Sequence, residues 1–159
     1  MRNKMVLIIL SILVLFGLLI FATNYKNNQT VQKEDNPYDK ETLHQETIDL
    51  MDDPLYQNII VPDELDDKLA DGESATVYYF SPTCSYCQQT TPVVMPVAED
   101  MDVDLLQMNL LEYEKMDYYD VEGTPTIIHY EDGEEVDRIV GYHEEDEFRT
   151  FFEEHVVNE

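Results

Sequence analysis

Cys84 and Cys87 are separated by two residues and are the side chains of this sequence best suited to chemistry. The pattern around them predicts a buried strand at 75–80 and a helix that begins at Cys84. A thiol at the amino end of a helix lies near unpaired backbone N–H groups, which stabilise a thiolate. A thiolate attacks a disulfide, and a second thiol one turn further along the helix displaces the first partner. The pair therefore predicts thiol–disulfide exchange, with Cys84 as the nucleophile and Cys87 as the resolving cysteine.

Two other roles compete with redox chemistry for this cysteine pair. A structural disulfide would close so small a loop that it would hardly constrain the unfolded chain. Half of a zinc site would need two further ligands. The histidines do not supply them at a ligand spacing, because they are scattered at His44, His129, His143 and His155. We therefore expect no metal and no cofactor apart from a redox-active disulfide between the two cysteines.

Short apolar runs alternate with amphipathic stretches after residue 54, and these elements must position the cysteines. The predicted strands are 59–61, 75–80, 103–110, 126–130 and 135–140, and the predicted helices are 62–72, 84–97, 112–119 and 144–157. Asp132-Gly133 predicts a hairpin turn between the last two strands. The order β-α-β-α-β-α-β-β-α predicts an α/β fold, a mixed central sheet flanked by helices. Pro92 and Pro96 are expected to bend the cysteine helix or to end it early.

Four motifs follow one another along the second half of the chain. They are Val77-Tyr78-Tyr79-Phe80-Ser81-Pro82-Thr83-Cys84-Ser85-Tyr86-Cys87, Gly123-Thr124-Pro125-Thr126, Asp132-Gly133-Glu134 and Val140-Gly141. In this order they resemble the thioredoxin family over residues 56–159. The resemblance implies a thioredoxin-like fold with a cis peptide bond before Pro125, although most X-Pro bonds are trans. It also implies a groove for a substrate strand, formed by Ser85, Tyr86, Thr124 and Pro125.

The sequence departs from the thioredoxins at positions that bear on the direction of electron flow. Ser85-Tyr86 stands where they have Gly-Pro, and Thr83 stands where they have Trp. Their buried Asp corresponds to Tyr78, and the Lys that faces it corresponds to Gln107. Without the acid, the site lacks a nearby proton acceptor for Cys87. Oxidase, isomerase and reductase directions therefore all stay open.

The amino-terminal part of the chain predicts a membrane anchor. The apolar run in residues 5–22 is long enough for one membrane-spanning helix, so residues 1–23 are interpreted as an anchor. A cleaved signal peptide is the alternative. Residues 24–55 are polar and acidic, which is typical of a tether, with a short helix around 41–51. Residues 56–159 form the predicted domain.

Charge sets the expected location and partners. The chain has 35 acidic and 9 basic residues, for a formal net charge of −26. Such a surface repels nucleic acid and anionic lipid headgroups, so neither is expected as a partner. Arg2 and Lys4 precede the apolar run, which favours a cytoplasmic amino terminus. We expect a bacterial cell membrane, crossed once, with the domain outside the cytoplasm.

Three functions are consistent with these features. The first is a protein disulfide oxidoreductase whose partners are protein thiols and disulfides outside the cytoplasm and a membrane electron-transfer protein. The second is a non-catalytic accessory module at the cell surface that keeps the fold. The third is a metal-delivery protein. Alkylation of the two cysteines distinguishes the first from the second, because an inert pair would label slowly and equally.

Overall fold

The computed structural model describes residues 2–31 and 36–157, and the chain divides into two compact units. One unit contains helix α1 (Arg2–Val31). Within α1, the stretch Met5–Thr23 is long and apolar enough to cross a membrane, and none of it is buried. This stretch is a candidate for the predicted span, and a signal sequence near the amino terminus would meet the same criteria of length and composition. Helix α1 continues past the predicted end of the anchor, and residues 32–35 of the predicted tether lie outside the described residues.

The second unit contains a four-stranded mixed sheet, as predicted. Its strands are β1 (Ala75–Phe80), β2 (Leu105–Asn109), β3 (Thr126–Glu131) and β4 (Glu134–Val140), in the order β2-β1-β3-β4. β1 runs parallel to β2 and antiparallel to β3, and β3 and β4 form the predicted hairpin. All residues of β1 are buried, as expected of a β-branched and aromatic run in a central strand.

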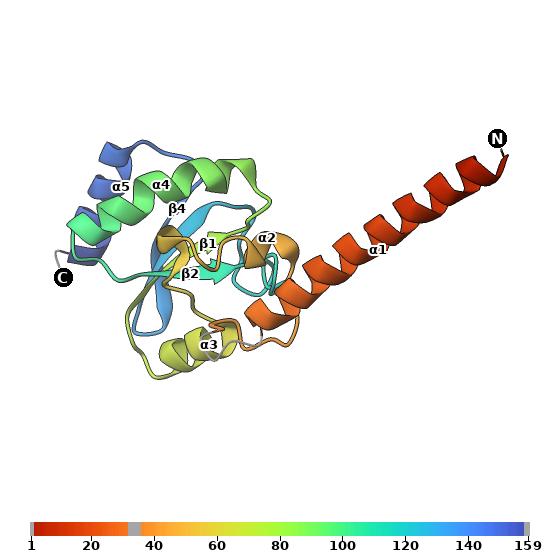
Figure 1. The fold of residues 1–159 in the computed structure, drawn as a ribbon. Helices are drawn as coiled ribbons and strands as arrows, with labels where there is room; N and C mark the ends of the chain where they lie inside the picture. Colours follow the sequence, from red (N-terminus) through yellow and green to blue (C-terminus); the bar gives the residue numbers. More distant parts are fainter. Residues whose placement is uncertain (1, 32–35, 158–159) are drawn as a thin grey trace. The chain divides into compact units, whose positions relative to one another are not determined.

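Helices cover both faces of the sheet (Figure 1). Helix α3 (Pro62–Ala70) lies on one face, and helices α4 (Ser85–Asp100) and α5 (Glu145–Phe152) lie on the other. Successive side chains of a strand point to opposite faces. Tyr78 therefore packs in the cluster with Phe152 of α5, whereas Tyr79 packs in the cluster with Leu65 of α3.

The predicted helix at 112–119 is wrong, because the structure has turns there. Tyr119 is buried, and its hydroxyl donates to Asp66 Oδ1 at 2.8 Å. The Glu112 side chain is also buried, and it accepts a hydrogen bond from the backbone N–H of His44. These tertiary contacts and the positive φ of Asp120 override the local helix propensity of the segment.

Other elements differ from prediction in length. The predicted strand at 59–61 is reduced to one parallel bridge between Ile59 and Gln107. Helix α4 runs unbroken to Asp100 instead of ending early at its prolines. Pro92 is exposed and Pro96 is exposed, so water can bind the carbonyl groups that lose their helical partners. The last helix ends at Phe152, and a π-helical turn follows over 153–157.

The second unit starts earlier in the chain than the predicted boundary at residue 56. It includes 37–39 and 44–56, which we call the N-terminal segment, with the short helices α2 (Gln45–Ile48) and η1 (Pro54–Tyr56). Tyr38, Thr47 and Tyr56 of this segment are buried. Part of the predicted tether is thus folded, because a few apolar and hydroxyl side chains repay the ordering of an otherwise polar stretch.

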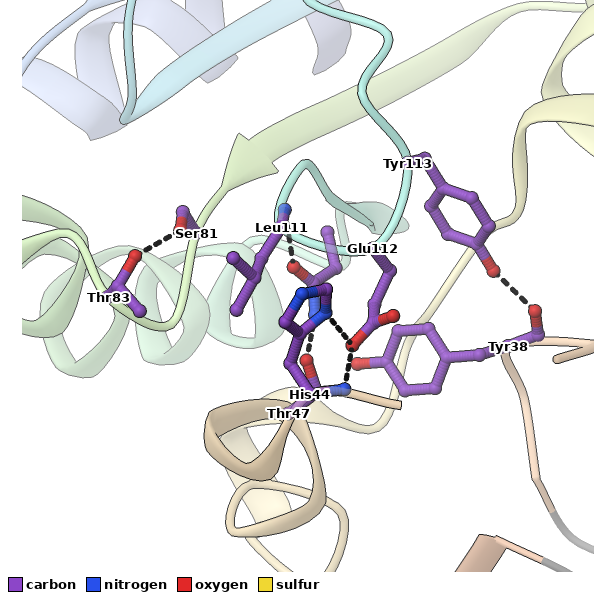
Figure 2. A network of polar contacts seen from close by, with 9 residues as sticks. Tyr38, His44, Thr47, Ser81, Thr83, Leu111, Glu112 and Tyr113 are labelled. Carbon is purple, nitrogen blue, oxygen red and sulfur yellow. Dashed lines mark hydrogen bonds and ion pairs between the residues drawn. The ribbon is translucent and has the colours of Figure 1, made fainter. Parts of the chain in front are cut away.

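Polar contacts hold the N-terminal segment to the turns that follow β2 (Figure 2). The buried amide of Asn109 donates to Thr47 Oγ1 at 3.1 Å. The backbone N–H of His44 donates to the buried carboxylate of Glu112 at 2.9 Å, and the Tyr113 hydroxyl donates to the carbonyl of Tyr38. Asn109 is the last residue of β2, where it pairs with Phe80 at the end of β1, and Glu112 and Tyr113 follow it.

Candidate active site

Cys84 lies at the junction between the central strand and the first long helix after it. β1 ends at Phe80, and Cys84 occupies the N-cap position of α4 with extended backbone angles of φ −82° and ψ 118°. The turn between them is fixed by the Gln88 side chain, which donates to the carbonyl of Pro82 at 2.8 Å. The Ser81 and Thr83 hydroxyls are also hydrogen-bonded to each other, at 2.9 Å (Figure 2). The predicted placement of the first cysteine at a helix start is confirmed.

The helix start favours a thiolate at Cys84. Partial burial of the sulfur acts to raise the pKa of Cys84. Hydrogen bonds with Thr124, Cys87 and the backbone of Tyr86 act in the opposite direction, and the pKa of Cys84 is lowered overall. The backbone groups among these belong to the first turn of α4, where N–H groups have no partner within the helix. A lowered pKa and partial exposure are the properties of a reactive cysteine.

Cys87 has the opposite environment, one turn further into α4. Its residue is 1% exposed, and both cysteines are free thiols. Burial is the largest influence on Cys87 and raises the pKa of its thiol to about 11. The pair therefore contains one thiol whose pKa is lowered and one whose raised pKa keeps it protonated at neutral pH. This asymmetry is the arrangement that exchange through a nucleophile and a resolving thiol requires.

The loop before β3 brings two of the predicted groove residues to the cysteines. The Sγ atom of Cys84 lies 3.2 Å from the carbonyl oxygen of Thr124, and the Thr124–Pro125 peptide bond is cis. The loop is anchored on one side by the Thr126 hydroxyl, which donates to the carbonyl of Gly123 at 2.8 Å. Thr124 is half-buried and Pro125 is buried. The backbone of Thr124 therefore contacts the Cys84 sulfur directly, and Pro125 is buried next to Thr124 in the chain.

The other two predicted groove residues lie on the exposed first turn of α4. Ser85 is exposed, and Tyr86 is 62% exposed. The backbone N–H of Tyr86 is among the groups that lower the pKa of Cys84. No described contact joins the side chains of Ser85 or Tyr86 to Thr124. The first turn thus offers a polar hydroxyl and a large exposed ring beside Cys84, where an incoming polypeptide can meet them.

Hydroxyl groups gather behind Cys87, and of these the sequence pattern pointed to Tyr78 alone. The Thr91 hydroxyl donates to the carbonyl oxygen of Cys87 at 3.0 Å, and the Tyr78 hydroxyl lies 3.1 Å from that of Thr91. Tyr78 pairs in register with Gln107, so these two of the departures from the thioredoxins lie side by side in the sheet. The position of Thr91 could have been predicted from the sequence, because it follows Cys87 by four residues and residues four apart share a helix face. Tyr56, which belongs to the same core cluster, had no such signal.

The described residues contain no group of three or more His, Cys, Asp or Glu side chains arranged to hold a metal ion. The histidines have other contacts. His143 lies 3.0 Å from Glu147, and His155 lies 3.0 Å from Asp137. His129 is buried, with its ring hydrogen-bonded to the Thr76 hydroxyl.

Comparison with known proteins places this geometry in a known family. The family model described as Thioredoxin matches residues 57–154. A thioredoxin of Staphylococcus epidermidis is 27% identical over 100 residues, which cover 61% of this chain and 95% of the relative. A thioredoxin of Chlamydia caviae is 32% identical over 79 residues, which cover 48% of this chain and 78% of the relative.

Solved structures show the same fold. A mutant thioredoxin from Halobacterium salinarum NRC-1 is 31% identical, with a TM-score of 0.51 over 58% of this chain and 83% of that one. A thioredoxin from Plasmodium falciparum is 19% identical, with a TM-score of 0.55 over 62% of this chain and 99% of that one, and this likeness is one of fold alone. The family model starts after Tyr56 and covers the sheet and the cysteine helix, so the N-terminal segment lies outside it.

Proposed function

The chain belongs to the thioredoxin family, and we propose that it is a protein disulfide oxidoreductase that exchanges disulfides through Cys84 and Cys87. The observation that carries this proposal is the asymmetry of the two thiols. Cys84 is partly exposed with a lowered pKa, whereas Cys87 is buried with a raised pKa. Thiolate character and access decide which cysteine attacks, so Cys84 is the nucleophile. The two cysteines themselves are the redox centre, and the reaction needs no further cofactor.

The reaction proceeds in two exchanges of a sulfur–sulfur bond. In the reducing direction, the Cys84 thiolate attacks a substrate disulfide, forms a mixed disulfide and releases one substrate thiolate. The Cys87 thiol then loses its proton and attacks the Cys84 sulfur. The bond between Cys84 and the substrate breaks, and the second substrate sulfur leaves with the electron pair. The cysteine pair ends as a disulfide, and the substrate gains two electrons. The oxidising direction is the same sequence reversed.

The substrate class that we propose is an extended polypeptide segment carrying a thiol or a disulfide. Thr124 supports this, because its carbonyl oxygen lies at the Cys84 sulfur and its backbone can pair with an extended strand. Pro125 shapes the floor of this groove, and Ser85 and Tyr86 form the exposed rim on the helix side. A polypeptide bound along Thr124 would present its sulfur to Cys84.

We propose that the domain works outside the cytoplasm, held to a membrane by the apolar part of α1. The stretch Met5–Thr23 has the length and composition of a span. The partners are then protein thiols and disulfides on that side of the membrane and an electron-transfer protein in the membrane. Oxidising compartments are where protein disulfides form and persist, which suits this reaction.

The proposal is tested on the full-length chain in detergent by alkylation and by trapping. Iodoacetamide should label Cys84 at least about ten times faster than Cys87 at pH 7, because only Cys84 ionises readily. The Cys87→Ser variant should accumulate mixed disulfides with unfolded disulfide-bearing proteins, and the Cys84→Ser variant should not. A matched control is Thr150→Ser, an exposed position on α5 outside the proposed groove, which leaves both thiols in place. Equal and slow labelling of the two cysteines, or equal trapping by both variants, would remove the proposal in favour of a non-catalytic module.

A further inference from the structure

A tight turn from Ser81 to Cys84 connects β1 to α4. The backbone N–H of Cys84 donates to the carbonyl oxygen of Ser81 at 3.1 Å, and Pro82 occupies the second position, where its fixed φ suits a turn. The hydroxyls of Ser81 and Thr83 are hydrogen-bonded to each other at 2.9 Å (Figure 2). Both contacts lie within the turn, so they set its shape without fixing its orientation on the helix.

Gln88 joins this turn to the helix. The backbone N–H of Gln88 donates to the carbonyl oxygen of Cys84 at 3.1 Å, which closes the first turn of α4. The side-chain amide of Gln88 reaches back to the carbonyl oxygen of Pro82 at 2.8 Å. Pro82 is buried, whereas Gln88 lies on the exposed side of α4. One helical residue therefore bonds to the turn on both sides of Thr83, and its side chain ties the middle of the turn to α4.

The chemistry of Cys84 depends on where the turn places its sulfur. The Sγ atom lies 3.2 Å from the carbonyl oxygen of Thr124. Burial acts to raise the pKa of Cys84, and hydrogen bonds outweigh it. These bonds come from Thr124 in the loop before β3 and from Cys87 and Tyr86 in the first turn of α4. Hydrogen bonds weaken steeply as their distance and angle depart from the optimum, so a small rotation of the turn would remove them.

We propose that Gln88 is a positioning residue for disulfide exchange, whose side chain holds the Ser81–Cys84 turn on α4 and so keeps the Cys84 sulfur at the helix start and at the Thr124 carbonyl. This inference rests on the proposed function. Gln88 acts through the turn and not on the sulfur itself. Without its bond to Pro82 the turn would adopt other orientations, and the Cys84 thiolate would lose its donors for part of the time. A smaller fraction of thiolate at neutral pH and a slower attack follow.

The decisive variant is Gln88→Met, which keeps the length of the side chain and removes its donor. The full-length chain in detergent is alkylated with iodoacetamide over a range of pH, and the rate at Cys84 is followed. We expect the midpoint of this profile to rise by about half to one pH unit, the size of one net hydrogen bond expressed as a pKa change. At pH 7 the rate should fall about two- to fourfold, because the smaller thiolate fraction is partly offset by a more nucleophilic thiolate. The rate at high pH should not fall, since Cys84 is fully ionised and accessible there.

Two further variants separate the bond to Pro82 from a general effect on the helix. The matched control is Gln89→Met, because Gln89 is the next exposed residue and its amide donates to the carbonyl of Ser85 within α4, at 2.9 Å. Its midpoint should stay at that of the parent. Gln88→Asn keeps the amide on a side chain one methylene shorter, which cannot reach Pro82. It should therefore raise the midpoint as Gln88→Met does.

Two outcomes would overturn the inference. One is an unchanged midpoint in Gln88→Met, whether or not the rate at high pH changes. The other is an equal rise in Gln88→Met and Gln89→Met, which would mark a general weakening of the first turns of α4. The parent chain tests the proposed function separately. If Cys84 of the parent reacted no faster than Cys87, the exchange reaction would be removed and this inference with it, whereas a normal parent beside an unchanged Gln88→Met would remove this inference alone.

Discussion

Thr47→Val tests whether the N-terminal segment is a structural part of the redox domain. Thr47 is fully buried, and its hydroxyl accepts from the amide of Asn109, which is also fully buried. Valine has nearly the same shape but cannot accept a hydrogen bond. The N–H of Asn109 that now bonds to Thr47 would then be buried without this acceptor. The sequence alone predicted a tether here, and a tether would tolerate the change.

The expected loss follows from the burial of both partners. An unsatisfied buried donor costs about 1 to 3 kcal/mol, so we expect the free energy of unfolding to fall by about 2 kcal/mol. With a denaturant dependence of about 2 kcal/mol per molar urea, the unfolding midpoint should fall by roughly 1 M. The assay is urea unfolding of the full-length chain in detergent, followed by the near-ultraviolet circular dichroism of its tyrosines.

The matched control is Thr150→Val on the exposed side of α5. Thr150 donates only to a carbonyl of its own helix, so the change should stay within about 0.5 kcal/mol. If Thr47→Val changed the free energy of unfolding as little as Thr150→Val does, the N-terminal segment would not be packed on the domain in solution, and the earlier start of the folded unit would be refuted.

Three further predictions follow from the described contacts. The alkylation rate of Cys84 should rise with pH with a midpoint below the usual thiol range near about 8.5, because its pKa is lowered, and a midpoint above that range would contradict the site. Gly133→Ala should destabilise the fold by about 2 to 4 kcal/mol, since φ is +79° and an added Cβ would lie 2.1 Å from the Leu69 carbonyl oxygen; a melting temperature within about a degree of the parent would exclude this packing. Tyr119→Phe should cost about 1 kcal/mol in urea unfolding by removing the hydrogen bond to Asp66, and no loss would show that the bond contributes nothing.

The sequence predicted those parts of the fold that depend on local pattern. β1 is a continuous β-branched and aromatic run, and Asp132-Gly133 is a hairpin turn dipeptide, so both were recognisable without tertiary information. The cysteine helix was found for the same reason. Its unbroken course past Pro92 could not be read from the sequence, because it depends on which side of the helix faces water.

The parts that were not predicted depend on contacts between distant residues. The segment at 112–119 has the composition of a helix. Its first and last residues, however, form hydrogen bonds with residues far earlier in the chain, Glu112 with His44 and Tyr119 with Asp66. The contact between Glu112 and His44 also helps to fold part of the predicted polar tether onto the domain. At the site, the sequence indicated that Tyr78 replaces an acid, but its distance to Thr91 requires the sheet and the helix to be packed together.

The acidic surface and the reactive thiol are compatible because their interactions act over different ranges. A formal net charge of −26 on its own opposes ionisation of Cys84. Charges on an exposed surface are screened over roughly 8 to 10 Å at physiological ionic strength, whereas the hydrogen bonds from the first turn of α4 act at direct contact with the sulfur. The local donors therefore dominate, and the pKa of Cys84 falls despite the surrounding acids. The surface charge acts instead on the encounter with a partner, where it favours the approach of basic polypeptides over acidic ones.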